Sequence, residues 1–425
     1  MAEEKVQMRK QLGLLEGVAI ILGIIFGSGI FISPKEVLEK TGSVWGALTV
    51  WAACGVLATL GAMSYAELGT ALAQSGGDYH YINEAFGPLP AFLYLWDANI
   101  VFVPSTNAIM SVTFANNLLE PIFPNCPIDP LCQKLIAAVT ICRLEHFEDG
   151  WAGTKTSVSD WSVAFYSGIF SYSGWNYLNF MTEELRDPFV NLPRAIYISL
   201  PLVTGIYLLA NISYFAVLGP VGVRATEAIA VDFAVVALGW LKWAMPTLVA
   251  IAILGGLSVH IMTSSRMCFA GARNGHMPEL LAHINVKCMS PMPSLVFLML
   301  ISLIMLIPSN LTSLITYCTV VESFFTLLSC SAVLWLRYKR PELVRPIKVS
   351  LWMPIIFVAV LLVLMIVPVV SEPVAVIAGA LITLAGVPVY FVLVRGQPKY
   401  LSNVSVKFTH VCQKLFLTAV EDKDE

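Results

Sequence analysis

Long apolar stretches alternate with short polar ones along almost the whole chain. A helix needs about 20 apolar residues to cross a bilayer, and ten stretches reach or approach that length. They are residues 13–33, 44–72, 89–118, 160–181, 195–218, 240–271, 293–307, 314–336, 351–370 and 374–394. The pattern predicts an all-α polytopic membrane protein with about ten spans. It has a polar tail (1–12), a transmembrane domain (13–394) and a second polar tail (395–425).

The first apolar stretch is interrupted where a membrane helix should be continuous. Gly23 to Pro34 reads GIIFGSGIFISP, with Gly27, Ser28 and Gly29 in its middle. Glycine costs about 1 kcal/mol relative to alanine in a helix, and no water at that depth satisfies freed backbone groups. Broken helices of this kind line the polar substrate sites of many transporters. The alternative is that Gly23 and Gly27, spaced as GxxxG, only let two helices pack closely.

A second interruption lies in the other half of the chain. Gly168 to Trp175 reads GIFSYSGW inside another apolar stretch. Two broken helices in separate halves point to a binding site more strongly than one. The two breaks therefore favour a transporter whose substrate binds near the middle of the membrane.

Composition and charge agree with a membrane protein. The chain is 57% hydrophobic and 12% charged, with a mean hydropathy of +0.76, which excludes an ordinary soluble fold. If the N-terminus is cytosolic, the outside segments hold 7 of the 25 basic residues and the inside segments the other 18. The seven are Lys35, Lys40, Lys134, Arg143, Lys155, Arg224 and Lys242. This split follows the positive-inside rule and predicts that both tails are cytosolic.

Motifs for covalent chemistry are missing from the sequence. The chain has no GxxxxGK[ST] nucleotide loop, no HExxH pair and no cysteine and histidine spacing that suits zinc. We therefore predict that the protein is not an enzyme, has no cofactor and no metal site, and binds no nucleic acid.

Several long segments, in order, resemble one known family. They are GSGIFISPKEVL (27–38), WAACGVLATLGAMSYAELGTALAQSGGDYHY (51–81), FYSGIFSYSGWNYLNFMTEELRDPFVNLP (165–193), TSSRMCFAGARNGHMPELL (263–281), LRYKRPELVRPIKV (336–349) and LAGVPVYF (384–391). Over nearly its whole length the chain resembles the light subunits of heteromeric amino-acid transporters. These form the L-type group within the amino acid-polyamine-organocation superfamily.

The resemblance implies a fold and an activity. The family fold is an inverted repeat of five plus five spans with two extra C-terminal spans. Its members are plasma-membrane antiporters that exchange neutral, and in some cases cationic, L-amino acids without sodium, by alternating access. We expect the same amino-acid transport here.

The resemblance also implies roles for the residues at the two breaks. Ser28 and Gly29 would donate to the substrate carboxylate, and carbonyls near Ile25, Phe170 and Ser171 would accept from the α-amino group. Half-helix N-termini favour anions and unwound carbonyls favour cations, which agrees with these roles. Gly27 and Ser173 complete the expected substrate-binding set at the breaks. Phe170 resembles the aromatic residue that closes over bound substrate, and Trp175 looks like a packing and gating residue.

A loop cysteine matches the family's link to its partner. Cys126 corresponds to the cysteine that forms an intermolecular disulfide with a single-span glycoprotein heavy chain, which carries the light subunit to the cell surface. The alternative is that Cys126 pairs with Cys132, six residues away.

The chain departs from the family between residues 118 and 160. The family has its fourth and fifth spans there, but this chain offers only the eight apolar residues from Leu135 to Cys142. Eight residues make about 12 Å of helix, which cannot cross a core of about 30 Å. A lysine that the family places on the fifth span also has no counterpart. A non-transporting partner of the heavy chain, which competes with intact light subunits, is therefore the alternative to a transporter.

The predicted side-chain pocket differs from the family as well. Where the family's tenth span carries aromatics and an asparagine, this chain has Val320, Glu322 and Ser323, and His260 replaces a small residue of the eighth span. Ionisable groups inside a membrane are functional candidates. Our hypothesis is that Glu322 and His260 share the cavity and admit a cationic or polar side chain. The alternatives are that Glu322 hydrogen-bonds neighbouring helices, or reflects relaxed constraint in a non-transporting chain.

Two acidic residues follow the second broken stretch. Glu183 and Glu184 lie at its expected cytosolic end. We expect them to cap a helix or to form ion pairs that close a gate, and not to contact substrate.

Overall fold

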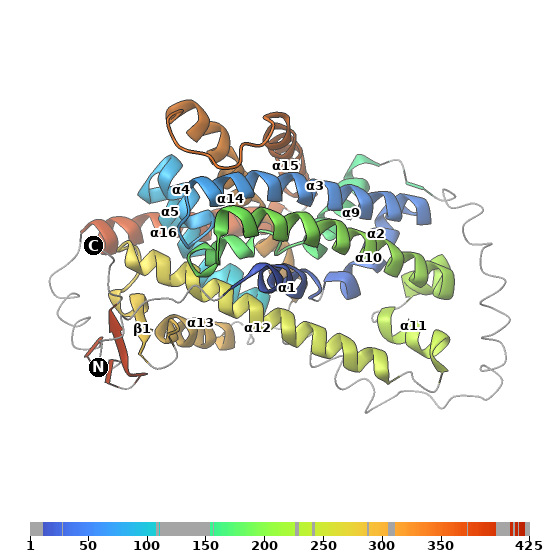
Figure 1. Cartoon of the computed structure of the whole chain (residues 1–425). Coiled ribbons are helices and arrows are strands. Elements are labelled where there is room, and N and C mark those ends of the chain that lie inside the picture. The colour runs from blue at the N-terminus through green and yellow to red at the C-terminus, as the bar shows by residue number, and fades with distance from the viewer. Residues whose placement is uncertain are drawn as a thin grey trace.

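The structure is a computed structural model in which most of the apolar part of the chain is helical (Figure 1). It describes residues 12–27, 29–107, 110, 154–155, 157–225, 229–239, 243–286, 289–304, 311–371, 373–396, 409–410, 413–414 and 416–420. The helices of the first half are α1 (Leu14–Ile25), α2 (Gly29–Thr41), α3 (Val44–Ala71), α4 (Asp78–Phe86), α5 (Pro88–Asp97), η1 (Ala98–Phe102), α9 (Val158–Ser171) and η2 (Tyr177–Glu184). Those of the second half are α10 (Pro188–Ala225), α11 (Ile229–Ala237), α12 (Ala244–Arg273), η4 (Glu279–Ala282), α13 (Met292–Ile304), α14 (Leu311–Lys339), α15 (Trp352–Ser371), α16 (Pro373–Val389) and η5 (Tyr390–Arg395).

Each of the ten predicted stretches overlaps a helix. The third is described only up to residue 107 and again at residue 110. Within the described residues, five helical stretches are long and apolar enough to cross a membrane: Leu14–Phe31, which contains the break between α1 and α2, and the helices Val44–Ala71, Pro188–Ala225, Ala244–Arg273 and Val320–Lys339. Shorter apolar helices are Met292–Ile304, Trp352–Ile366 and Gly379–Arg395. A helical membrane protein with several spans is thus confirmed, while the number of crossings stays a prediction.

Both predicted breaks are present. α1 ends at Ile25 and α2 begins at Gly29, so the first stretch consists of two half-helices. α9 continues to Ser171, three residues further than the start of the predicted interruption. The chain then turns through Gly174, whose φ of +104° strongly favours glycine, and resumes as the 3₁₀ segment η2. The stretch 160–181 is therefore not one continuous helix.

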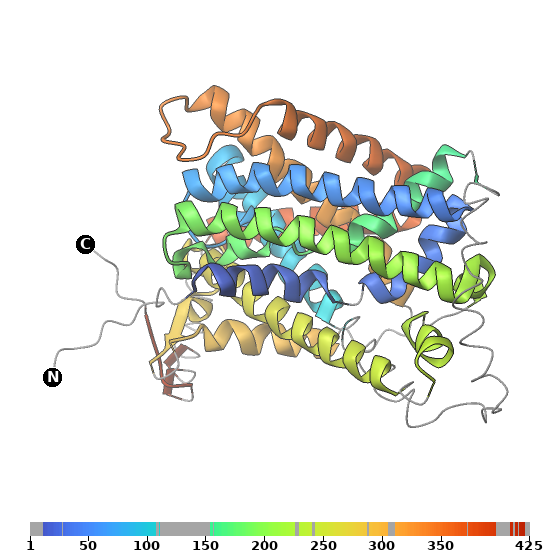
Figure 2. The same cartoon turned by 45° about the vertical axis from the view of Figure 1, so that its right-hand side comes forward.

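The helices pack lengthwise around this broken pair. α3 and α10 lie side by side over much of their length, and α1 packs against α10 and α12 (Figure 2). A Cβ added to Gly55 of α3 would lie 2.4 Å from Oγ1 of Thr204, so glycine permits this close approach. Large exposed apolar side chains, such as Leu209 on α10 and Ile251 on α12, point away from the bundle. In a membrane protein such a surface faces lipid.

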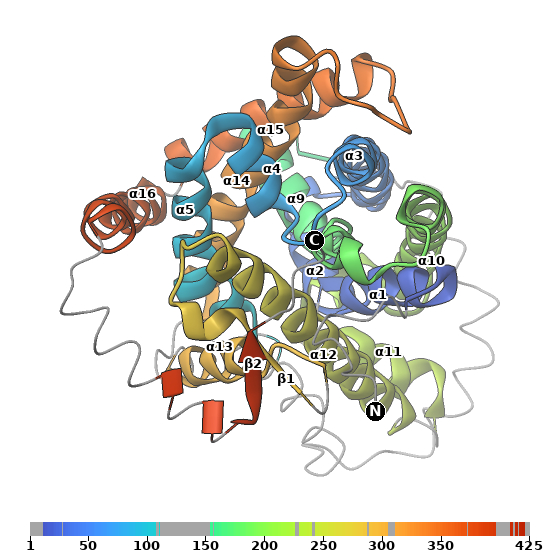
Figure 3. The same cartoon turned by 60° about the vertical axis from the view of Figure 1, so that its left-hand side comes forward.

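The end of the bundle where α3 ends carries polar connections. Strand β1 (His283–Asn285) pairs antiparallel with strand β2 (Thr418–Val420), which comes from the C-terminal tail. α16 lies at the outer edge of the bundle when it is viewed end-on (Figure 3). Its place is fixed in part by Trp96 of α5, whose indole nitrogen donates to the Ile382 carbonyl at 3.1 Å.

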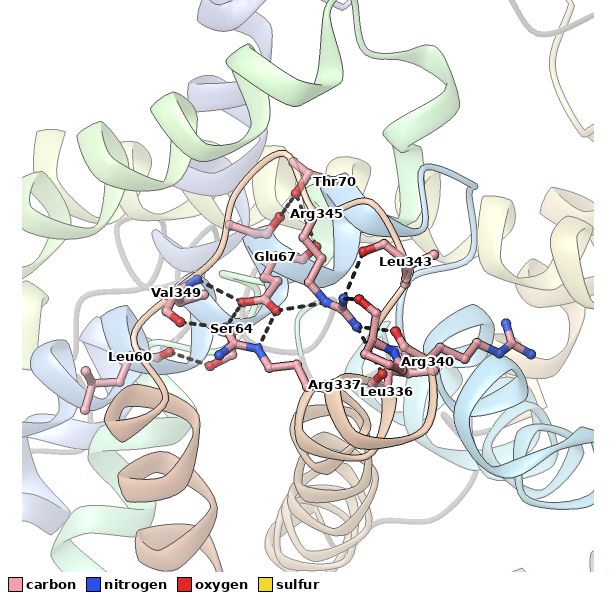
Figure 4. A network of polar contacts seen from close by, with 12 residues as sticks. Leu60, Ser64, Glu67, Thr70, Leu336, Arg337, Arg340, Leu343, Arg345 and Val349 are labelled. Atoms are coloured by element: carbon pink, nitrogen blue, oxygen red, sulfur yellow. Dashed lines mark hydrogen bonds and ion pairs between the residues drawn. The ribbon is translucent and has the colours of Figure 1, made fainter.

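A buried charge network joins α3 to the loop between α14 and α15 (Figure 4). Glu67 is 1% exposed and accepts from Arg337 and from the Val349 amide, the latter at 2.9 Å. Arg345 lies 3.5 Å from the same carboxylate. Arg345 also donates to the carbonyls of Leu336, Arg340 and Leu343 at 2.9–3.1 Å.

Candidate functional site

The two breaks meet backbone to backbone. α2 begins at Gly29, and a Cβ added there would lie 2.5 Å from Cα of Ser171, where α9 ends. No side chain fits into that distance. Glycine at position 29 is thus a requirement of the contact between the two broken helices.

Tyr207 of α10 connects the carbonyl ends of both breaks. Its hydroxyl oxygen lies 2.5 Å from the Ile25 carbonyl oxygen and 2.9 Å from that of Ser171, and the side chain is fully buried. A hydroxyl has one proton and satisfies one carbonyl at a time. At any moment, therefore, one of these two carbonyl oxygens is without this donor.

A cavity lies at the two breaks. Eight of the nine substrate-binding residues predicted from the sequence line it: Ile25, Gly27, Gly29, Phe170, Ser171, Ser173, His260 and Glu322. The ninth, Ser28, is outside the described residues. Its lining residues include Gly29, at the N-terminus of α2, and also Ile25 and Ser171, at the carbonyl ends of α1 and α9. Helix dipoles favour an anion at the first position and a cation at the second, so the cavity is suited to the carboxylate and ammonium of an α-amino acid.

The two ionisable residues of the cavity each have their own partners. Nδ1 of His260 lies 2.8 Å from the Asn107 side-chain oxygen, and its Nε2 lies 3.1 Å from the Tyr177 hydroxyl. Glu322 accepts a hydrogen bond of 2.9 Å from the Ser173 hydroxyl. Glu322 and His260 both line this cavity, and their role in substrate binding stays a prediction. His260 thus contacts two neutral side chains, and Glu322 contacts Ser173 of the second break.

Trp175 is packed behind the second break. Its ring makes edge contacts with Tyr65 at 4.9 Å and with Phe357 at 6.0 Å between ring centroids. The next residue, Asn176, donates to Asp78 at 3.0 Å, and Asp78 also accepts from Tyr65. The packing role predicted for Trp175 agrees with these contacts, and its gating role stays a prediction.

Two ion pairs lie just beyond the broken segment. Glu183 pairs with Arg273 at 2.6 Å and Glu184 pairs with Arg266 at 2.7 Å, which ties η2 to the end of α12. The predicted ion pairs of Glu183 and Glu184 are confirmed. Burial raises the pKa of Glu183, but the hydrogen bonds and charge of Arg273 and the hydrogen bonds from Ser75 lower it more, so this pKa lies below its ordinary 4.5.

Some predicted residues could not be located, and some residues of the site were not predicted. Cys126 and Cys132 are outside the described residues. Tyr207, Tyr177, Asn107 and Asp78 were not predicted, because a polar residue in an apolar helix does not reveal its partner. Within the described residues, no group of three or more histidines, cysteines and acidic residues is placed to hold a metal ion.

Comparison with known proteins gives one family. A profile of the amino acid permease family matches residues 12–144 and 140–394. The chain is similar to the "Large neutral amino acids transporter small subunit 2" of Mus musculus, with 40% identity covering 96% of this chain and 86% of the relative. It is also similar to the human "Asc-type amino acid transporter 1", at 38% identity over 100% of this chain and 90% of the relative. The chain is also similar to the human "Cystine/glutamate transporter", with 37% identity over 100% of this chain and 93% of the relative. All three relatives are transporters and not enzymes, in agreement with the sequence.

Proposed function

The chain belongs to the amino acid permease family, and from this premise we propose that it is the light subunit of a heteromeric amino-acid transporter. It exchanges L-amino acids without sodium, by alternating access around the two broken helices. The observation that carries the proposal is the shared hydroxyl of Tyr207, which contacts the carbonyl oxygens of Ile25 and Ser171, two residues that line the cavity. This arrangement suits a substrate ammonium, and the N-terminus of α2 suits its carboxylate.

The substrate class extends to neutral and cationic amino acids. Glu322 lines the cavity next to Ser173. A carboxylate at this position attracts a cationic or polar side chain. Phe170 closes over the substrate and Trp175 supports the gate.

The partner is a single-span glycoprotein heavy chain, bound through Cys126. The name of one relative contains the words "small subunit", which supports a second, larger chain. In this assembly the protein is at the plasma membrane, both tails are cytosolic, and the loop with Cys126 is extracellular, where a disulfide is stable.

The chain lacks the fourth and fifth spans of the family fold, an inverted repeat. Two observations support this proposal. The family profile matches in two parts that meet near residue 140. The alignment with the mouse relative runs over 460 positions but contains 96% of 425 residues, or about 408, so about 52 of its positions are gaps in this chain.

The gap also favours a second candidate function. A chain without two helices of the first repeat can bind the heavy chain and fail to transport, and thereby compete with intact light subunits.

Labelled amino-acid uptake tests the transporter proposal. The chain is co-expressed with a heavy chain, surface biotinylation measures delivery, and Cys126→Ser is the control for the disulfide. Uptake coupled to efflux of preloaded substrate is the expected result. Surface delivery through Cys126 without any uptake would support the competing partner instead.

The role of Glu322 has its own test. Glu322→Gln keeps the shape of the side chain and removes its charge. We expect the preference for lysine over norleucine, which has a neutral side chain of similar length, to fall. An unchanged preference would remove Glu322 from the proposal.

A further inference from the structure

Glu322 stands at the boundary between two cavities. Together with Phe170 and Ser173 it lines the cavity at the breaks and also a second cavity. This second cavity, here called the distal chamber, lies between α3, α9, α14 and α15. Because three residues are common to both cavities, the distal chamber adjoins the cavity at the breaks on the Glu322 side.

The wall of the distal chamber is aromatic and is fixed by packing. Trp175 and Phe357 line it, and their rings make the edge contact described above. A Cβ added to Gly61 would lie 2.6 Å from the Phe357 ring and 2.9 Å from that of Trp175, so both rings pack directly onto the α3 backbone. Packing against α3 therefore fixes these two rings of the wall in place.

The chemistry of the lining selects a type of side chain. Ring surfaces pack well against methylene groups, and their faces attract cations. Glu322 accepts one hydrogen bond from Ser173, and a carboxylate can accept several more. Ser323 and Thr326 add hydroxyl groups to the wall. An apolar stem with a positive end fits this set of groups, and an anionic end is repelled by it.

We propose that the distal chamber is the side-chain subsite of this protein, and that it takes a long unbranched side chain with a cationic end. The inference rests on the proposed function, because main-chain binding at the two breaks is what directs the side chain past Ser173 and Glu322. Phe357 and Leu361 then make α15 part of the substrate site.

Ligand-induced thermal stabilisation tests the subsite without requiring transport. The full chain in lipid nanodiscs is titrated with lysine, norleucine, alanine and 2,3-diaminopropionate, which separates length from charge. Ser323→Leu fills the chamber, and Phe324→Leu, at an exposed neighbour of the same helix, is the matched control. We expect Ser323→Leu to weaken the binding of lysine and norleucine at least about tenfold. The affinity for the two short ligands, alanine and 2,3-diaminopropionate, should change less than about twofold.

A second pair of variants tests the subsite independently, in case Ser323→Leu does not fold. Leu361→Ala opens the chamber wall, while Leu362→Ala alters the exposed side of α15. Only Leu361→Ala should change the ratio of long-ligand to short-ligand affinity.

Each outcome separates this inference from the proposed function. Equal weakening of long and short ligands by Ser323→Leu and Leu361→Ala would overturn the subsite and leave the main-chain site standing. Stabilisation by no amino acid at all would overturn both. If the long ligands weaken selectively but Glu322→Gln leaves the lysine to norleucine ratio unchanged, the chamber stands and its cationic preference is overturned.

Discussion

The Tyr207 hydroxyl lies 2.5 Å from the carbonyl oxygen of Ile25, a residue 182 positions earlier in the chain. The same hydroxyl is within 2.9 Å of the Ser171 carbonyl oxygen. One side chain of α10 thus joins the two half-helix ends that the site requires.

Removal of this hydroxyl should weaken both the fold and the binding site. Tyr207→Phe deprives two buried carbonyls of their shared donor, and a buried polar group without a partner costs about 1–3 kcal/mol. We expect a lower Tm and weaker stabilisation by amino acids. Tyr197→Phe, at a 56% exposed position of the same helix, is the control. If the two variants behave alike, the bridge has no energetic role.

The contact between the two breaks should be sensitive to a single methyl group. Gly29→Ala places a Cβ 2.5 Å from the Ser171 backbone, which forces the broken helices apart. We expect the variant to lose amino-acid binding, measured by ligand-induced thermal stabilisation. Gly205→Ala of α10 is the matched control, because its Cβ meets open space. Retained binding in Gly29→Ala would show that the breaks can separate without harm.

The buried network at Glu67 should contribute far more stability than a surface ion pair. Glu67→Gln leaves Arg337 and Arg345 without their carboxylate, and breaking such a buried pair costs about 3–5 kcal/mol. Glu84→Gln breaks the pair with Arg340, in which the Glu84 side chain is 30% exposed and that of Arg340 46%. Loss of such an exposed pair costs about 1 kcal/mol or less. The Tm values of the Glu67→Gln and Glu84→Gln variants are compared by thermal unfolding in detergent. Equal losses of Tm would contradict the structural role of the network.

The ion pair between Glu183 and Arg273 should depend on pH in a defined direction. The folded pKa of Glu183 lies below 4.5, so its stabilisation is present above 4.5 and is lost as the pH falls through the folded value. The Tm difference between wild type and Glu183→Gln should be constant near neutral pH and shrink in acid. A difference that grows as the pH falls would mean that the pKa is raised.

The sequence was sufficient for the features that depend on local pattern. The apolar stretches, the interruption at Gly27 to Gly29 and the turn before Trp175 follow from composition and from glycine, and the structure confirms them. The exact end of α9 did not follow, because Ile169 to Ser171 read equally well as helix or break.

The contacts that complete the site depend on long-range packing. Three examples join residues far apart in the chain: Tyr207 contacts Ile25, Asn107 contacts His260, and Asp78 accepts from Asn176. In none of these cases does the local sequence pattern identify the partner. Only the packing of α10, α12 and α4 against the breaks decides which of them meet.

Arg345 gives order to a segment that has no regular secondary structure. Between α14 and α15 its guanidinium takes the place of a backbone ladder, because one side chain bonds the carbonyls of Leu336, Arg340 and Leu343. A helix spreads such bonds over many residues, so that one substitution removes little of its order. Here three such bonds and the contact with Glu67 depend on one side chain, so a single substitution of Arg345 would remove all of them together.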